Sequence, residues 1–265
     1  MKDILLITPP FTQLNTPYPA TAYLKGFLNT KNIASHQIDL GIEVILELFS
    51  KTQLEKLFSH AEKNSTIISD NCKRINALKE AYLDTINLII TFLQGQNATL
   101  ARQICTDGFL PEASRFEQLD DLDWAFGEMG LQDKAKHLAT LYLEDLSDFI
   151  VECVDSNFGF SRYAERLGRS ANSFDELYDN LQGELTYIDK ITLELLHEKI
   201  NTKQPKLVCF SVPFPGNLYS GFRCAQFIKK NFPSIKIAMG GGFANTELRS
   251  VSDKRVFEFF DFVTL

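Results

Sequence analysis

The sequence predicts an α/β protein: a doubly wound, mainly parallel five-stranded sheet of the Rossmann or flavodoxin-like type, with strand order 2-1-3-4-5 and a large all-helical insertion between strands 2 and 3. Three observations lead to this prediction. Near-continuous aliphatic runs at residues 3–8 and 206–212 are typical of parallel strands that are covered on both faces. Helical periodicity alternates with strand signals at both ends of the chain. Residues 41–205 carry almost no strand signal, although an ordinary crossover needs only about a dozen residues.

The first forty residues predict a strand, a helix and a second strand. Residues 3–8 form the first strand, and Pro9 and Pro10 end it because proline cannot donate to a ladder. Pro17 and Pro19 suit the first turn of a helix. Five apolar residues then fall on one helical face: Ala20, Tyr23, Leu24, Phe27 and Leu28. Residues 33–40 alternate enough to form a strand nearer the edge of the sheet.

The middle of the chain shows helical periodicity. Apolar residues recur at helical spacing in five segments, which are residues 42–61, 78–92, 135–154, 174–181 and 186–200. A segment of this length must hold a core of its own. We therefore predict an α/β domain formed by residues 1–45 and 205–265, with residues 46–204 as a helical insertion domain.

The last sixty residues repeat the opening pattern. Residues 206–212 predict a buried strand, residues 213–216 a turn, and Asn217 the cap of a helix. Residues 236–239 predict a strand that runs into three consecutive glycines, where the backbone can bend sharply. Residues 245–255 are expected to form a short helical connection, and residues 262–265 a final strand.

The composition is that of a globular protein. The chain has 265 residues, of which 45% are hydrophobic and 23% charged. Its formal charge of −7, from 34 acidic and 27 basic residues, disfavours binding to nucleic acid or to an anionic membrane surface. The apolar runs are too short to cross a bilayer and the N-terminus has no signal-peptide pattern. We expect a cytoplasmic protein with neither nucleic acid nor membrane as a partner.

The five cysteines have wide, irregular spacing without a CxxC pair. This pattern predicts neither a zinc site nor a disulfide framework. We interpret all five as structural residues. No metal-ligating residue is predicted in this chain.

Three loops are the candidate ligand site, because open α/β sheets bind ligands beyond the carboxyl ends of their strands. They are residues 8–19, 211–217 and 240–245. The glycines allow close backbone approach, Ser211 can donate a hydrogen bond, and the remaining residues can form apolar walls. The candidate cofactor-binding residues are Pro9, Pro10, Phe11, Thr12, Ser211, Val212, Pro213, Gly240, Gly241, Gly242 and Phe243. The alternative is that the prolines and glycines only make turns and that Ser211 bonds to its own backbone.

The chain has neither of the common nucleotide-binding motifs. No GxGxxG follows the first strand, and no GxxxxGK[ST] occurs. A dinucleotide site of the Rossmann type and a P-loop therefore have little support. If Gly241 faces a ligand, its replacement by valine is expected to abolish binding while leaving the fold largely intact.

Two strings resemble a known family. Leu5-Leu6-Ile7-Thr8-Pro9-Pro10, followed by the Tyr-Leu-containing helix of residues 18–28, resembles the opening of the cobalamin-binding domains that precede radical S-adenosylmethionine cores. Residues 208–212 and 235–242 are similar to that family's third strand and Gly-Gly loop, and residues 260–264 to its fifth strand. The resemblance covers residues 1–48 and 205–265.

The resemblance implies a cobalamin (B12) cofactor held next to a radical S-adenosylmethionine domain. The CxxxCxxC motif for a [4Fe–4S] cluster is missing, so the cluster and S-adenosylmethionine would belong to a part C-terminal to residue 265. This chain would not be catalytic alone, and the complete enzyme would be a methyltransferase or a related enzyme acting on a peptide or small molecule. The Asp-x-His-x-x-Gly signature is also absent, which leaves cobalt without a named histidine ligand.

A second hypothesis belongs to another class. The α/β part is then a scaffold without a cofactor, and the helical insertion is a peptide- or protein-binding module. Its motivation is the length of the insertion, since the cofactor fold would be complete without residues 46–204.

Overall fold

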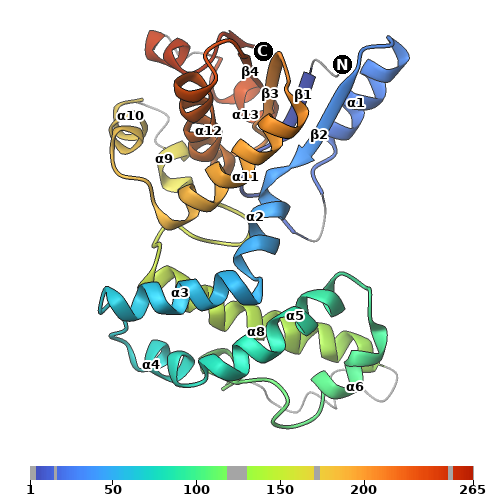
Figure 1. The fold of residues 1–265 in the computed structure, drawn as a ribbon, viewed down its shortest axis with the longest axis vertical. Coiled ribbons are helices and arrows are strands. Elements are labelled where there is room, and N and C mark those ends of the chain that lie inside the picture. Colours follow the sequence, from blue (N-terminus) through green and yellow to red (C-terminus); the bar gives the residue numbers. More distant parts are fainter. Residues whose placement is uncertain (1–3, 15–16, 118–129, 170–173, 250–252, 265) are drawn as a thin grey trace. The chain divides into compact units, whose positions relative to one another are not determined.

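Five parallel strands form one sheet in the order β2-β1-β3-β4-β5 (Figure 1). The computed structural model describes residues 4–14, 17–117, 130–169, 174–249 and 253–264. The strands are β1 (Ile4–Thr8), β2 (Ser35–Asp39), β3 (Leu207–Ser211), β4 (Lys236–Gly240) and β5 (Phe262–Val263). The α/β class, the parallel sheet and the predicted strand order are confirmed.

The chain divides into two compact units. The sheet unit comprises Met1–Ile45 and Asn157–Leu265, and the helical unit comprises Leu46–Ser156. The helical unit is thus shorter than the predicted segment of residues 46–204. Residues 157–203 lie with the sheet because their helices pack against α12.

The helices of the sheet unit, apart from the connections between β4 and β5, are α1 (Ala20–Thr30), α9 (Glu165–Arg169), α10 (Asp175–Gln182), α11 (Tyr187–Lys203) and α12 (Leu218–Asn231), with the 3-10 turn η4 (Pro215–Asn217) before α12. Helix α2 (Leu40–Leu48) begins in the sheet unit and continues past Ile45. Helix α12 lies on one side of the sheet and α1 on the other (Figure 1). Right-handed crossovers that run in opposite directions from the middle strands produce this arrangement.

The two faces of the sheet carry side chains of different size. One face presents large, fully buried residues such as Leu5, Ile7 and Phe210. Phe210 packs edge-on against Phe260, which in turn packs against Phe222 of α12. The face toward α1 carries smaller residues on β3 and β4, because side chains alternate along each strand: Cys209, Ser211, Ala238 and Gly240.

A buried polar network joins α11 to α12. The carboxylate of Asp189 accepts a hydrogen bond from the Tyr219 hydroxyl at 2.9 Å and pairs with Arg223 Nε at 3.1 Å. The Arg223 guanidinium also donates to the backbone carbonyl of Leu181 at 2.8 Å, which ties in α10. Asp189 further completes the capping box of α11 with Thr186. All these charges are satisfied, which a buried ion pair requires.

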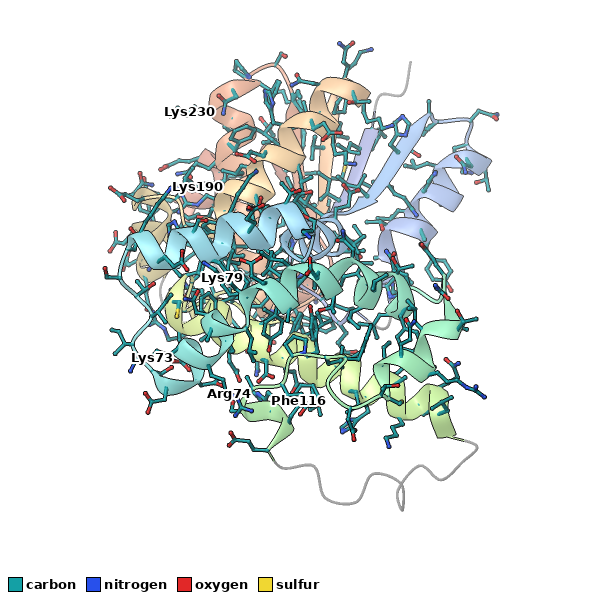
Figure 2. All side chains as sticks on the ribbon, turned by 60° about the horizontal axis from the view of Figure 1, so that its bottom comes forward. Lys73, Arg74, Lys79, Phe116, Lys190 and Lys230 are labelled. Atoms are coloured by element: carbon teal, nitrogen blue, oxygen red, sulfur yellow. The ribbon has the colours of Figure 1, made fainter. Side chains whose placement is uncertain are left out.

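The helical unit has a core of its own. Its elements are the end of α2 with α3 (Lys51–Lys63), α4 (Asp70–Ala77), α5 (Lys79–Leu93), η1 (Ala98–Leu100), α6 (Ala101–Ile104), η2 (Ser114–Phe116) and α8 (Leu131–Cys153). Phe58 of α3 packs on Phe149 of α8, and Tyr82 of α5 on Tyr142. Figure 2 shows Lys73, Arg74 and Lys79 at the surface of this unit. They form ion pairs with Asp70, Glu117 and Glu62.

Some predicted helices differ from the structure. Residues 42–61 form two helices rather than one, because Ser50 leaves the helical conformation and its hydroxyl caps α3 through the Gln53 N–H. The connection predicted at 245–255 is instead α13 (Gly242–Thr246) and the 3-10 helix η5 (Lys254–Glu258), and residues 250–252 lie outside the described chain. Helix α4, capped by Ser69, was not predicted. Within the described residues, no helix is long and apolar enough to cross a bilayer.

Removal of one partner from the buried ion pair should destabilise the sheet unit. We expect Arg223→Leu to lower the free energy of unfolding by about 3–5 kcal/mol, because it leaves the buried Asp189 carboxylate without its cation. Urea denaturation measures the loss. The double variant Arg223→Leu/Asp189→Asn should recover part of it, since the buried charge is then gone as well. A single variant within about 1 kcal/mol of the parent would show that the pair contributes little.

Candidate functional site

The loops that follow β1, β3 and β4 meet at the carboxyl edge of the sheet. The Asn217 side-chain amide donates to the carbonyl of Pro9 at 2.7 Å and to that of Phe11 at 2.8 Å. The Val212 N–H donates to the Gly240 carbonyl at 2.8 Å, and the Phe243 N–H donates to the Val212 carbonyl at 3.1 Å. The structure therefore brings together the three loops that the sequence predicts as the candidate ligand site.

Most of the apolar candidates in these loops pack against the protein itself. Pro9, Pro10, Val212, Pro213 and Phe243 are buried. Phe11 is fully buried as well, and its ring makes edge-on contacts with two aromatic rings, those of Phe158 at 5.8 Å and Tyr163 at 6.1 Å. These six residues form the packed base of the loops rather than the walls of a cavity.

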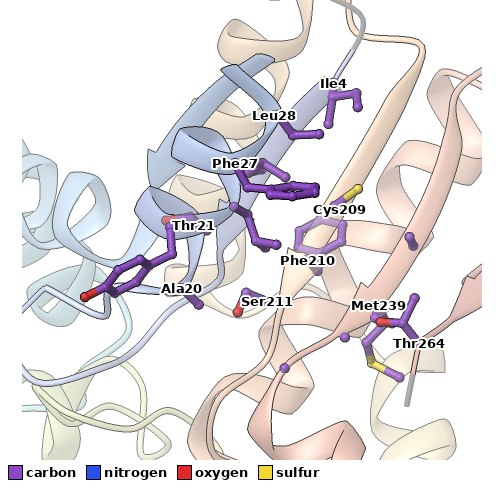
Figure 3. A pocket seen from close by; sticks show the side chains of 16 residues that line it. Ile4, Ala20, Thr21, Phe27, Leu28, Cys209, Phe210, Ser211, Met239 and Thr264 are labelled. Carbon is purple, nitrogen blue, oxygen red and sulfur yellow. The ribbon is translucent and has the colours of Figure 1, made fainter. Parts of the chain in front are cut away.

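A cavity lies beside this base, between α1 and the sheet (Figure 3). We call it the α1 pocket. Its volume is about 620 Å³, which is within the usual range for small-molecule sites. Of the candidate residues it includes Ser211, Gly240 and Gly241. Its full lining is Ile4, Leu6, Ala20, Thr21, Tyr23, Leu24, Phe27, Leu28, Cys209, Phe210, Ser211, Ala238, Met239, Gly240, Gly241 and Thr264.

The α1 pocket is open because the side chains of α1 and of the sheet do not fill the space between them. The apolar face of α1, expected from its spacing to pack on the sheet, stays largely open: Tyr23 is 77% exposed and Phe27 58%. Opposite this face, β3 and β4 offer short side chains, among them Cys209 and Ala238. Figure 3 shows Phe27 and Cys209 bordering the same hollow. The spacing of apolar residues predicted the face of α1 correctly but not that it would be left uncovered.

Ser211 is a buried polar residue at this pocket. Its hydroxyl oxygen is fully buried and has no hydrogen-bond partner in the described structure. The alternative that this serine bonds to its own backbone is therefore not observed. A buried hydroxyl without a partner costs about 1–3 kcal/mol, and a ligand atom within reach would remove that cost.

The glycines of the loop after β4 have different surroundings. Gly241 has φ +112° and ψ 179°, a conformation that only glycine adopts readily. A Cβ at Gly241 would lie 2.6 Å from the Val212 carbonyl oxygen. A Cβ at Gly240 would meet the Thr264 hydroxyl, and one at the exposed Gly242 would lie 3.2 Å from the Pro213 carbonyl oxygen. The protein's own backbone, not a ligand, thus requires a glycine at position 241.

Thr12 lies apart from the other candidates. It lines a second cavity of about 350 Å³, formed with the loop that leads into α1 and with the segment before α9. Residues 161–165 in that segment were not predicted as part of a site, because they carry no motif and are far from Thr12 in the chain.

The described residues contain no group of three histidine, cysteine or acidic side chains that could hold a metal ion. No histidine lines the α1 pocket. Cys209 is its one thiol, and burial raises the pKa of that thiol to about 11. The chemistry available in the pocket is therefore apolar contact with a few hydroxyl groups.

The chain was compared with protein-family models, with curated proteins and with solved structures, and nothing matched in any of the three comparisons. The α1 pocket thus has to be interpreted from its geometry and from the motifs in the sequence. The geometry and the motifs both indicate the carboxyl edge of β3 and β4.

The conformation of Gly241 predicts a loss of stability on substitution. We expect Gly241→Ala, and Gly241→Val even more, to lower the free energy of unfolding by at least about 1–3 kcal/mol, because the side chain collides with the Val212 backbone in a glycine-only conformation. Thermal and urea denaturation measure this. A stable valine variant would restore the expectation that this position faces only a ligand.

The raised pKa of Cys209 predicts slow alkylation at neutral pH. The thiolate is the reactive form, so the rate of iodoacetamide labelling at Cys209 should climb about tenfold per pH unit from roughly pH 8 to 10. A free thiol with a pKa of about 8.5 levels off above about pH 9.5 and serves as the reference. Peptide mass spectrometry separates Cys209 from the other cysteines. A plateau near pH 9.5 at Cys209 would contradict the raised pKa.

Proposed function

We propose that the sheet unit is a cobalamin-binding domain of flavodoxin-like, doubly wound type, interrupted by a helical insertion, and that the α1 pocket receives the nucleotide tail of the cofactor. The observation that carries the proposal is the α1 pocket itself: an open apolar cavity that ends at the carboxyl edge of β3 and β4. The two strings that resemble the cobalamin-binding family flank this pocket, one through α1 and one through β3 and β4.

The chemistry of the tail matches the lining. The benzimidazole base is flat and apolar, and the walls offer aromatic and aliphatic side chains such as Phe27 and Leu6. The ribose and phosphate carry hydrogen-bonding oxygens, and the Ser211 hydroxyl is a buried group that lacks a partner. Because Gly240 has no Cβ, the backbone at this position leaves more room in the pocket.

The corrin ring would lie outside the pocket, over the loops at the carboxyl edge. Since no histidine lines the pocket, we propose that the cobalt has no protein ligand from it. On the resemblance alone, we also propose that this unit serves a radical S-adenosylmethionine domain, which would supply the [4Fe–4S] cluster, S-adenosylmethionine and the catalytic groups. The residues described here would bind and orient the cofactor.

A comparison of cobalamin with cobinamide, which lacks the nucleotide tail, tests the proposal. We expect hydroxocobalamin and methylcobalamin to bind at micromolar concentration and cobinamide to bind at least about tenfold more weakly, a difference of about 1.4 kcal/mol, because it leaves the α1 pocket empty. Spectral titration and calorimetry measure the affinities. Ala238→Phe, which places a ring in the pocket, should remove the preference for cobalamin, whereas Ala77→Phe, at an exposed position of the helical unit, should keep it.

Ser211→Ala completes the same experiment. The substitution should weaken cobalamin binding by about 0.5–1.5 kcal/mol, as for one hydrogen bond, while the free protein stays as stable or becomes more stable, because a buried hydroxyl without a partner is removed. Equal affinities for cobalamin and cobinamide would show that the nucleotide tail does not occupy the α1 pocket. If the folded protein binds neither compound, the cofactor proposal fails and the binding-module hypothesis takes its place.

A further inference from the structure

The second cavity of the sheet unit, which we call the Arg162 pocket, is separate from the α1 pocket. It has a volume of about 350 Å³, large enough for a small metabolite, and shares no lining residue with the α1 pocket. Its walls come from three segments: the loop that leads from β1 to α1, the turn after β3, and the residues at the start of α9. The residues used below are Thr12, Tyr18, Arg162, Glu165, Phe214 and Gly216.

Backbone packing holds Arg162 in place. The Gly216 carbonyl accepts a hydrogen bond from the N–H of Tyr163 at 3.1 Å. A Cβ at Gly216 would lie 2.8 Å from the Cβ of Arg162, so this close approach requires a glycine. Gly168 of α9 makes a similar close approach from the other side, because a Cβ there would lie 2.5 Å from the Pro215 carbonyl oxygen. The segment with Arg162 and Glu165 is thus fixed against the turn after β3, as a preorganised site requires.

Groups of both charges line the Arg162 pocket. Arg162 Nη1 lies 3.3 Å from a carboxylate oxygen of Glu165, and the arginine side chain is 63% exposed. One contact of this length leaves most of the guanidinium N–H groups able to donate to a ligand, in a planar fork that matches a carboxylate. The Glu165 carboxylate is the matching group for an ammonium.

Thr12 and two aromatic rings complete the walls. Thr12 is only 6% exposed, and no hydrogen bond of its hydroxyl is found among the described residues. This hydroxyl, on a largely buried side chain in the lining, is a polar group that can bond to a ligand. The rings of Tyr18 and Phe214 meet edge to face at 5.7 Å, and Phe214 is 52% exposed. They form an apolar wall beside the charged pair.

We propose that the Arg162 pocket binds an α-amino acid with an apolar or aromatic side chain. Arg162 receives the carboxylate, with the Thr12 hydroxyl as a further donor, Glu165 receives the ammonium, and the side chain lies against Phe214 and Tyr18. A simple anion would meet the Glu165 carboxylate close to its own binding group, and a simple cation would meet Arg162. A zwitterion satisfies both charges at once, since it leaves neither without a partner.

Three probes that share one ring test this proposal: L-phenylalanine, phenylacetate without the ammonium, and phenethylamine without the carboxylate. Calorimetry and saturation-transfer NMR on the whole chain should show L-phenylalanine binding at least about tenfold more tightly than either relative. Arg162→Gln and Glu165→Gln should each weaken L-phenylalanine binding by about tenfold or more. Arg166→Gln is the matched control, because Arg166 follows Glu165 in α9, pairs with Glu176 and does not line the pocket.

The opposite results are equally clear. Phenylacetate binding that matches L-phenylalanine and strengthens in Glu165→Gln would make this an anion site and overturn the proposal. Unchanged binding in Arg162→Gln would put the ligand elsewhere, and no binding of any probe at about 10 mM to a protein folded by circular dichroism would remove the site. Because the two pockets share no residue, a failed cobalamin titration does not affect this result.

Discussion

The side-chain amide of Asn217 is the interaction on which the carboxyl edge of the sheet depends. Asn217 is fully buried, and its amide donates to two carbonyls, those of Pro9 and Phe11, in a loop that has left β1 and has not yet entered α1. Buried carbonyls outside regular structure need such a donor. The amide therefore fixes the loop after β1 against the start of α12, and the positions of both pockets follow from that join.

The α1 pocket and the packed core result from one property of parallel strands, the alternation of side chains between two faces. Leu5, Ile7 and Phe210 fill the face toward α12, where Phe222 and Phe260 meet them. On the other face β3 and β4 turn Cys209, Ala238 and Gly240 toward α1, and the aromatic side chains of α1 line the α1 pocket but stay largely exposed. The large buried side chains are thus concentrated on one face of the sheet, while the other face borders the α1 pocket.

Local patterns in the sequence predicted the strands and part of the site, since aliphatic runs identify buried strands and ligands gather at their carboxyl ends, whereas the strand order was predicted from the doubly wound fold type. Ser211 and Gly240 at the α1 pocket were found in this way. Two features depend on distant contacts and left no local signal. Helices α9, α10 and α11 join the sheet unit through contacts with α12, among them the pairing of Asp189 with Arg223, and the segment with Arg162 can approach the turn after β3 because Gly216 has no Cβ. The role of Gly241 was misjudged for the same reason, because Val212 occupies the space beside it.

The register between β1 and β3 has a consequence for how the chain folds. Ile4 pairs with Leu207, so the central contact of the sheet closes a loop that contains the whole helical unit. The entropy of closing a loop grows only with the logarithm of its length, by about 0.6 kcal/mol for each doubling. Closing this long loop therefore lowers the free energy of unfolding only a little at equilibrium, but contacts of such high sequence separation form slowly. During synthesis the helical unit is complete before β3 emerges, so the edge of β1 that pairs with β3 stays unpaired until then.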